Sequence, residues 1–304
     1  MVATSVSRYT VSMSNAPSSP ETKSPEPLRE IWRGTFTKMR AEHTAPVSYF
    51  LRDGFYDPAR CVDELPMNAL LGRTLELRFE GLIHCVYCGR KSKKSFNQGF
   101  CYPCFRARAE ADICIVKPEL CHHGDPDDPC RDEEFAQTKC FRPHVLYASL
   151  TSGVKVGITR QPNVPSRWID QGAAAAIPLA VLPNRREVGL LEHRLAGQFQ
   201  DKTHWMTMLK NNHPDGDLEG GVATLLGLMD ELQVEGILPE AERRRYEFDY
   251  PVETWPLKVK SFNLDKTPVV GGCLHGIKGQ YLIFDTGVIN VRKYTGYVVS
   301  VHAS

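Results

Sequence analysis

The stretch that decides the fold is HVLYASLTSGVKVGITRQPNVPSRWIDQGAA, residues 144–174, followed by LLEHRL at 190–195. Apolar and β-branched residues fill two arms around a tight Ser-Gly turn, which predicts a β-hairpin. A short helix over SRWIDQ and an apolar strand, IPLAVL, are expected next. A longer helix should follow, because apolar residues recur at i, i+3, i+7 and i+11. These four are Val188, Leu191, Leu195 and Phe199. We therefore expect a compact α/β unit here.

Working outward, both ends of the chain carry β-like patterns. Short β-like runs fill 31–79, and the residues of TLELRF at 74–79 alternate between apolar and polar. From Trp255 onward, alternating apolar residues again lie between glycine-containing turns. Neither end has enough strands for a sheet of its own, so we expect the two ends to pack together. A helix is expected at 218–235, with Gly236 as its C-cap.

These patterns predict an α+β protein. It would have a β module built from the N- and C-terminal segments, a zinc-ribbon segment and a central α/β core. At about 150 residues per domain, the length suggests two units. The expected divisions are a disordered Ser/Pro/Thr-rich tail at 1–28, an N-terminal β segment at 29–82, a zinc-binding segment at 83–143, the core at 144–216, a helical connection at 217–250 and a C-terminal β segment at 251–304.

Cysteine spacing indicates a metal site. HCVYCGRK and FCYPCF supply Cys85, Cys88, Cys101 and Cys104, two C-x2-C pairs separated by twelve residues. Each pair lets two thiolates converge from one tight turn, and two turns complete the tetrahedron that zinc prefers. We predict a structural zinc ion at this site, with no coordination position left open for water.

A second zinc ion is expected farther along the chain. Its candidate ligands are Cys114, Cys121, Cys130 and Cys140, with His122, His123 and His144 nearby. Their irregular spacing leaves the ligand set open. A site with three cysteine ligands and an exchangeable water would instead indicate a zinc enzyme acting on a small molecule.

Charge patterning bears on nucleic-acid binding. Lys and Arg total 37 and Asp and Glu total 36, so only a local patch could attract phosphate. Six basic residues lie between Glu80 and Glu110 with no acid among them: Arg90, Lys91, Lys93, Lys94, Arg106 and Arg108. Phe96, Phe100, Tyr102 and Phe105 are interleaved with them. Phosphate attraction combined with base stacking predicts contact with nucleic acid, DNA or RNA. The alternative is a solvated basic face neutralised by the acidic stretch at 125–134.

Other classes of protein are disfavoured. No run of 18 apolar residues occurs, so a transmembrane helix is not expected. The first residues lack the apolar region of a signal peptide, and C-x-x-C pairs suit a reducing compartment. We expect a cytoplasmic protein.

The central stretch resembles the GIY-YIG nuclease superfamily, in which two hairpin strands carry the naming motifs and two helices carry an arginine and a glutamate. VLY, ending at Tyr147, resembles the first motif, and KVG resembles the second, with Lys155 in place of the usual tyrosine. Arg167 and Glu192 stand where the helical arginine and the metal-binding glutamate are expected. The resemblance implies that these four residues are catalytic.

Phosphodiester hydrolysis needs a base, cations near the phosphate and, in many enzymes, a metal ion. Tyr147 could serve as base only if Lys155 and Arg167 lower the pKa of its phenol from about 10. Glu192 would bind Mg²⁺ or Mn²⁺. In the alternative interpretation, Arg167 pairs with Asp170 and Glu192 is an ordinary exposed helix residue.

From about residue 31 onward the chain also resembles a bacterial family of unknown function. The shared runs are CxxCGR, GFCYPCF, CIVKPELCH, KVGITR, RWIDQGA, DKTHW and GIKGQYLIFDTGVINVRKYTGY. This resemblance implies a zinc-binding protein with a GIY-YIG-like core and implies no established activity. Our leading hypothesis is nucleic-acid binding with metal-dependent phosphodiester cleavage. The main alternative is a non-catalytic nucleic-acid-binding or adaptor protein on a degenerate nuclease scaffold.

Overall fold

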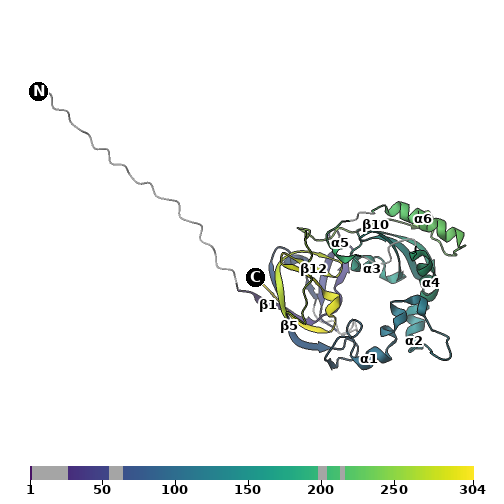
Figure 1. Ribbon diagram of the computed structural model, residues 1–304, viewed down its shortest axis with the longest axis horizontal. Helices are drawn as coiled ribbons and strands as arrows, with labels where there is room; N and C mark the ends of the chain where they lie inside the picture. Colours follow the sequence, from purple (N-terminus) through teal and green to yellow (C-terminus); the bar gives the residue numbers. More distant parts are fainter. Residues whose placement is uncertain (2–26, 55–63, 198–203, 213–215) are drawn as a thin grey trace.

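The computed structural model describes residues 1, 27–54, 64–197, 204–212 and 216–304. Nearly all of the expected N-terminal tail, together with Cys61 and Phe199, lies outside the described residues. Helices and sheets are both present, as expected for an α+β protein (Figure 1). None of the described helices has the length and apolar character that a bilayer span requires.

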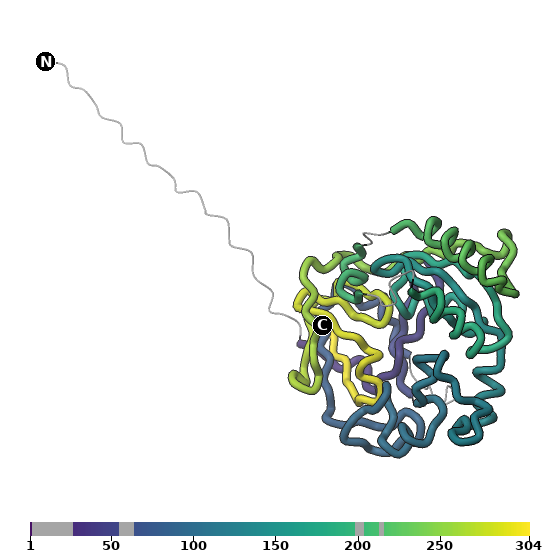
Figure 2. Tube along the Cα trace, turned by 45° about the vertical axis from the view of Figure 1, so that its right-hand side comes forward, coloured from purple at the N-terminus to yellow at the C-terminus, as the bar shows by residue number. Residues whose placement is uncertain are grey.

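A seven-stranded sheet combines strands from both parts of the chain that were expected to pair. Its strand order is β1-β14-β5-β11-β12-β13, and β6 pairs with β5. The bounds are β1 (Arg29–Thr35), β5 (Thr74–His84), β6 (Lys91–Ser92), β11 (Val269–Lys278), β12 (Tyr281–Phe284), β13 (Gly287–Asn290) and β14 (Tyr297–Ala303). Leu77 of β5 lies opposite Val301 on one side and Val270 on the other. The predicted packing of the two ends is therefore confirmed, and the first and last strands lie side by side in Figure 2.

A second, four-stranded antiparallel sheet has the order β10-β9-β7-β8. It comprises β7 (His144–Leu150), β8 (Val154–Arg160), β9 (Ala175–Leu182) and β10 (Tyr246–Glu247), with helices α3 (Ser166–Asp170), α4 (Arg185–Ala196) and α6 (Leu218–Glu231). The predicted hairpin is confirmed, and so are the short helix, the third strand and the two longer helices.

The remaining elements are short. A three-stranded sheet contains β2 (Arg40–Glu42), β3 (Ser48–Arg52) and β4 (Glu64–Pro66), and the small helices are α1 (Tyr102–Ala107), α2 (Glu133–Phe135) and α5 (Trp205–Leu209). Tighter helical turns cover Asn68–Leu70, Ala109–Ala111, Ile113–Ile115, Pro118–Leu120, Gln161–Asn163, Glu240–Glu242 and Val291–Tyr294, and a wider one covers Ala136–Cys140.

Helix α6 ends earlier than the sequence predicts. Its C-cap is Leu232, so the prediction that Gly236 caps this helix is wrong. Gly236 instead brings its backbone against β9, where its carbonyl accepts a hydrogen bond from the Val181 N–H at 2.9 Å. A Cβ at this position would lie 2.3 Å from the Val181 carbonyl oxygen, so only glycine fits.

The two faces of the four-stranded sheet are buried in different cores. Leu146 of β7 packs in a cluster with Leu191 of α4 and Leu225 of α6. The next residue, Tyr147, points to the opposite face, as the pleat of a strand requires. There it joins Trp168 and the side chains of the seven-stranded sheet in one continuous cluster. The four-stranded sheet therefore lies between α4 and α6 on one face and the β module on the other (Figure 1).

Gly157 of β8 makes room for the ring of Tyr147. The two residues are directly opposite in register. A Cβ on Gly157 would lie 2.7 Å from both the Oη and the Cζ of Tyr147, closer than real contacts allow. The glycine of the KVG run is therefore required by packing.

We expect Gly157→Ala to lower the free energy of unfolding by about 1–3 kcal/mol, the usual cost of overpacking a core. Urea denaturation at fixed pH measures the change. Gly227→Ala is the matched control, because an added methyl group on Gly227 of α6 would meet open space; it should stabilise the protein by about 0.5–1 kcal/mol. Equal urea midpoints of unfolding for Gly157→Ala and the parent chain would contradict the close contact between residue 157 and the Tyr147 ring.

Candidate functional site

Three of the residues expected to be catalytic converge on the amide of Gln171. Tyr147 comes from β7, Lys155 from β8 and Arg167 from α3, whose C-cap is Gln171. In the amide orientation that satisfies every neighbour, the nitrogen donates to Tyr147 Oη at 2.9 Å. The oxygen then accepts from Arg167 Nη2 and from Lys155 Nζ, each at 3.3 Å. The hairpin and α3 thus bring these side chains together.

Burial determines what Tyr147 can do. Its side chain is fully buried, with its ring 5.4 Å from that of Trp168 in a T-shaped arrangement, whereas Arg167 and Glu192 are partly exposed. Burial raises the pKa of the phenol; nearby Arg167 opposes this shift and Glu192 adds to it. The lowered pKa that a phenolate base would need is therefore not found.

Asp170 does not serve as the partner of Arg167. Its carboxylate instead accepts from Lys38 Nζ at 2.7 Å and from Gln280 Nε2 at 2.9 Å. Gln280 lies in the GIKGQY run, and Lys38 precedes β2, so both partners come from outside the central unit. These bonds fasten the end of α3 to the β module and leave the Arg167 guanidinium directed at Gln171.

Two further arginines surround the cluster. The positive charge of Arg185, at the start of α4, acts on Arg167, and Glu192 acts on Arg185. Arg292 follows β13, donates to Gln98 Oε1 at 2.7 Å and also experiences the charge of Arg167. Burial lowers the pKa of both Arg185 and Arg292. Arg167, Arg185 and Arg292 therefore concentrate positive charge, with Glu192 acting on Arg185 and Asp170 on Arg292.

The first cysteine group forms a compact donor set. The four Sγ atoms of Cys85, Cys88, Cys101 and Cys104 lie within 4.8 Å of one another. Those of Cys88 and Cys101 are 3.8 Å apart, close to the edge of about 3.8 Å that follows from Zn–S bonds of about 2.3 Å in a tetrahedron. This cluster can hold a structural zinc ion. Burial raises the pKa of Cys101 and of Cys104, whereas backbone N–H groups lower the pKa of Cys85 to about 7 although burial opposes this shift. Zinc binding would displace the protons that remain on the thiols.

Local turns place these four sulfur atoms. The Gly89 N–H donates to the Cys85 carbonyl at 2.8 Å, and Gly89 has φ +73°, which closes the first turn. Cys101 is the N-cap of α1, so Cys104 lies one helical turn away. Phe100 and Ala111 pack with the cysteines in a small apolar cluster.

The predicted basic residues fall into two groups. Arg90, Lys91, Lys93, Lys94 and Arg106 are exposed, and none of them forms an ion pair within the described part of the chain. Arg108 differs: it pairs with Glu110 at 3.4 Å and Asp132 at 3.2 Å and lies over the Tyr87 ring at 4.1 Å. Its guanidinium is engaged within the fold.

The interleaved aromatic residues pack mainly on one another. Phe96 stacks on Phe105 with ring centroids 5.9 Å apart and meets Tyr102 edge-on at 5.5 Å. Phe100 is only 5% exposed, whereas Tyr102 is 57% exposed. Of the four, Tyr102 has the most surface to offer a nucleobase.

The acidic stretch contacts histidines more than the basic residues. Asp128 lies 3.7 Å from His122, and Glu133 lies 3.0 Å from His123. Its Asp132 is the partner of Arg108. Within the described residues, the neutralisation considered from the sequence therefore reaches one of the six basic side chains.

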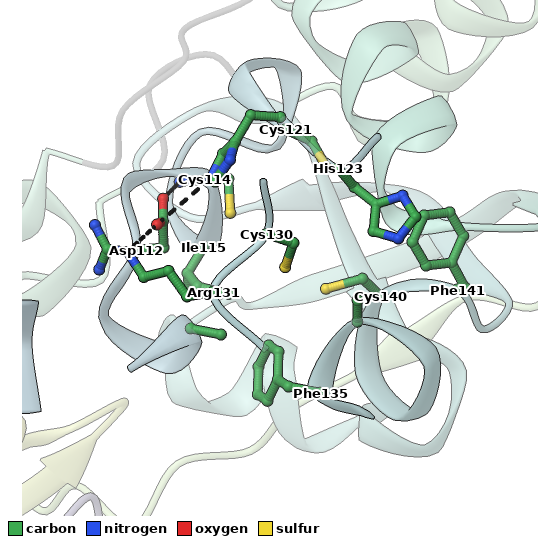
Figure 3. A pocket seen from close by; sticks show the side chains of 13 residues that line it. Asp112, Cys114, Ile115, Cys121, His123, Cys130, Arg131, Phe135, Cys140 and Phe141 are labelled. Carbon is green, nitrogen blue, oxygen red and sulfur yellow. Dashed lines mark hydrogen bonds and ion pairs between the residues drawn. The ribbon is translucent and has the colours of Figure 1, made fainter. Parts of the chain in front are cut away.

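The second cysteine group surrounds a pocket (Figure 3). Cys114, Cys121, Cys130 and Cys140 all line it, with His122 and His123. Donor atoms of Asp112, Cys114 and His122 also lie within 4.8 Å of one another. His144 bonds elsewhere and does not line the pocket. Its Nδ1 lies 2.7 Å from the Arg142 carbonyl oxygen, and burial lowers its pKa to about 4.

Sequence reasoning missed Gln171, Arg185 and Arg292. Gln171 lies in the RWIDQGA run, but its role depends on which way a side-chain amide points. Arg185 and Arg292 are brought near Arg167 only by the packing of α4 and of the turn after β13. No spacing along the chain reports such long-range approaches.

We expect Cys88→Ser to loosen the segment around the first cysteine group, because a three-ligand site binds zinc less tightly. Cys88 is exposed, so the substitution changes little packing. Amide hydrogen exchange should accelerate at least tenfold, about 1.4 kcal/mol, at Gly89 and Phe100 and remain unchanged in β7 and β9. Cys273→Ser, outside both cysteine groups, is the control. Unaltered exchange at Gly89 in zinc-loaded Cys88→Ser would count against the site.

Comparison with known proteins identifies a family. No curated protein and no solved structure matches the chain. The model of a family described as a protein of unknown function, DUF2797, matches residues 72–299, from just before β5 into β14. That span is about three quarters of the sequence and includes the Gln171 cluster and both cysteine groups. The chain therefore belongs to the DUF2797 family of proteins of unknown function.

Proposed function

We propose that this protein is a zinc-containing nucleic-acid-binding protein that cleaves phosphodiester bonds with a divalent metal ion, on a GIY-YIG-like core. One observation carries the proposal. Tyr147, Lys155 and Arg167 meet at Gln171, and the charge of Glu192 acts on that same cluster. The residues come from two strands and two helices, in the order that the superfamily resemblance implies.

The arginines would recognise the phosphate. Arg167 is partly exposed and has a planar fork that suits two phosphate oxygens. Arg185 and Arg292 add positive charge around it, which would stabilise the charge developing on phosphate during cleavage. Lys155 is 9% exposed, and its Nζ donates to the Gln171 oxygen beside Arg167.

Tyr147 would position the Gln171 amide and Arg167 and would not act as the base that deprotonates water. Because its phenol is buried with a raised pKa, it stays protonated near neutral pH. Its hydrogen bond to the nitrogen side of Gln171 fixes that amide, and the amide oxygen in turn holds Arg167. The phenol therefore acts through Gln171 on the direction of the guanidinium.

Glu192 would hold the divalent cation. Mg²⁺ in phosphate sites is commonly bound by one or two carboxylates together with the substrate phosphate, so a single partly exposed glutamate fits that role. When bound, the cation supplies Lewis-acid stabilisation of the charge on the phosphate. Nearby Arg185 and Arg167 repel a free cation, so we expect Mg²⁺ to bind appreciably only together with nucleic acid.

The exposed basic residues beside the first cysteine group would extend the binding surface. The hydrogen bond from Arg292 to Gln98 Oε1, at 2.7 Å, links this segment directly to the group of Arg167, Arg185 and Arg292. A nucleic-acid strand bound along Lys93 and Lys94 could therefore continue toward Arg167. Exposed Tyr102 offers a ring for stacking.

We expect Glu192→Gln to reduce cleavage of a labelled DNA or RNA panel at least a hundredfold in Mg²⁺ or Mn²⁺, and to change binding less than threefold, because the amide cannot replace the carboxylate ligand. Denaturing gels measure cleavage and native gels measure retardation. Glu231→Gln, an exposed glutamate at the end of α6, is the matched control.

The burial of Tyr147 favours a second candidate, the non-catalytic adaptor. Retardation without any cleavage by the parent chain would support that candidate and overturn the nuclease. Neither retardation nor cleavage on single-stranded, duplex, branched or structured substrates would overturn both.

We expect Lys93→Gln combined with Lys94→Gln to weaken binding about threefold to tenfold at low salt and to reduce the slope of log affinity against log salt by about 1–2. Fluorescence anisotropy over a salt series measures both quantities. Lys258→Gln with Lys260→Gln removes the same charge from exposed positions in the C-terminal segment and should leave both unchanged. Equal losses in the two double variants would show a nonspecific charge effect only.

A further inference from the structure

The segment from Asp112 to Pro143 has almost no apolar core. Only Asp112, Pro118 and Ala136 are buried within it, and no hydrophobic cluster of the described residues includes any of its members. Its regular structure is limited to turns and α2, of three residues. So little apolar burial does not offset the entropy of ordering a segment of this length. Another interaction must hold it.

Its four cysteines surround one small space. Cys114, Cys121, Cys130 and Cys140 line a cavity of about 20 Å³, enough for one water-sized particle. In Figure 3 the sulfur atoms of Cys114, Cys130 and Cys140 point toward the space between them. A cavity of this size lined by thiols suits a metal ion without its hydration shell.

Arg185 supplies a separate argument from charge. Its Nη2 donates to the Ile115 carbonyl, and its Nε is buried without a hydrogen-bond partner. Cys140 and Cys114 lie close enough that, as thiolates, their charge would act on this guanidinium, as the charge of Glu192 does. If the thiols were neutral, Glu192 alone of these three groups would balance the buried guanidinium. Four thiolates around Zn²⁺ instead sum to a net charge of −2.

Asp112 and His122 are already engaged beside the cavity. The Asp112 carboxylate accepts from Arg131 Nε at 2.8 Å and from the Cys114 N–H at 3.2 Å. His122 places Nδ1 2.6 Å from the Asp128 carbonyl, and its Nε2 faces Asp112 at 3.5 Å. Their donor atoms lie within 4.8 Å of those of Cys114, but because both are already bonded to other residues, their role in the proposal is to orient the cysteine-bearing loops.

We propose that Cys114, Cys121, Cys130 and Cys140 hold a second metal ion, a tetrahedral Zn²⁺, and that Arg185 balances the charge of this centre. The site organises the segment and clamps it on α4. Pro118 packs so closely on Gly189 of α4 that a Cβ there would lie 2.5 Å from the proline ring. Arg185 is thus a positioning residue that joins the metal centre to the helix carrying Glu192.

Metal content of the purified full-length chain tests the proposal without reference to any nuclease activity. After exhaustive dialysis, we expect inductively coupled plasma mass spectrometry to find two zinc ions per parent chain. One ion should remain in Cys130→Ser/Cys140→Ser and one in Cys88→Ser/Cys104→Ser. Cys273→Ser and His122→Ala should both retain two. A parent chain with one ion, lost completely in Cys88→Ser/Cys104→Ser, would overturn the second site.

A measurement on the parent chain covers variants that fail to fold. In zinc-loaded protein, peptides containing Cys114, Cys121, Cys130 and Cys140 should resist N-ethylmaleimide, and a chelator should make all four reactive. Rapid labelling of Cys130 and Cys140 before chelation would contradict the proposal. Loss of one zinc ion in His122→Ala would instead overturn the four-cysteine ligand set.

Discussion

Strand β7 is buried along its whole length, and the rest of the structure depends on this double burial. One face of the strand packs on α4 and α6 through Leu146, and the other packs on the β module through Tyr147. A strand that is apolar on both faces cannot remain at a surface, so it forces the two layers to assemble around it. The hydroxyl of Tyr147 is a polar group on that second face, and the Gln171 amide provides its hydrogen bond.

Local sequence patterns predicted the individual helices and strands well, because each element depends on residues that are close together in sequence. The hairpin, α3, α4 and α6 follow from periodicity, and the pairing of the chain ends follows from the need to complete a sheet. The end of α6 was missed because Gln233, a non-glycine residue, adopts the positive φ after the helix while Gly236 meets β9. Trp168 packs into the core of the β module through contacts with residues far away in the sequence, so no local stretch of sequence could predict this packing.

The candidate site shows the same division. The family resemblance grouped Tyr147, Lys155 and Arg167, and the structure brings these three side chains to Gln171. The catalytic roles of these residues and of Glu192 stay a prediction. The resemblance did not predict the direction of the Tyr147 pKa, which burial by distant strands determines. Asp170 illustrates the reason. Its position one turn after Arg167 on α3 suggested an ion pair between the two, yet its carboxylate bonds to Lys38 and Gln280 of the β module. Electrostatics at this site is a property of the assembled protein and not of the motif.

The interleaving of the two chain ends has a consequence for biosynthesis. β5 lies between β14 and β11, so during translation it remains without either partner until the ribosome has produced residues about two hundred positions later. A strand with one apolar face and two open edges is a template for association with other chains. The contacts also have high sequence separation, which slows folding. The nascent protein would therefore be a natural client for chaperones that shield strand edges until the last strand arrives.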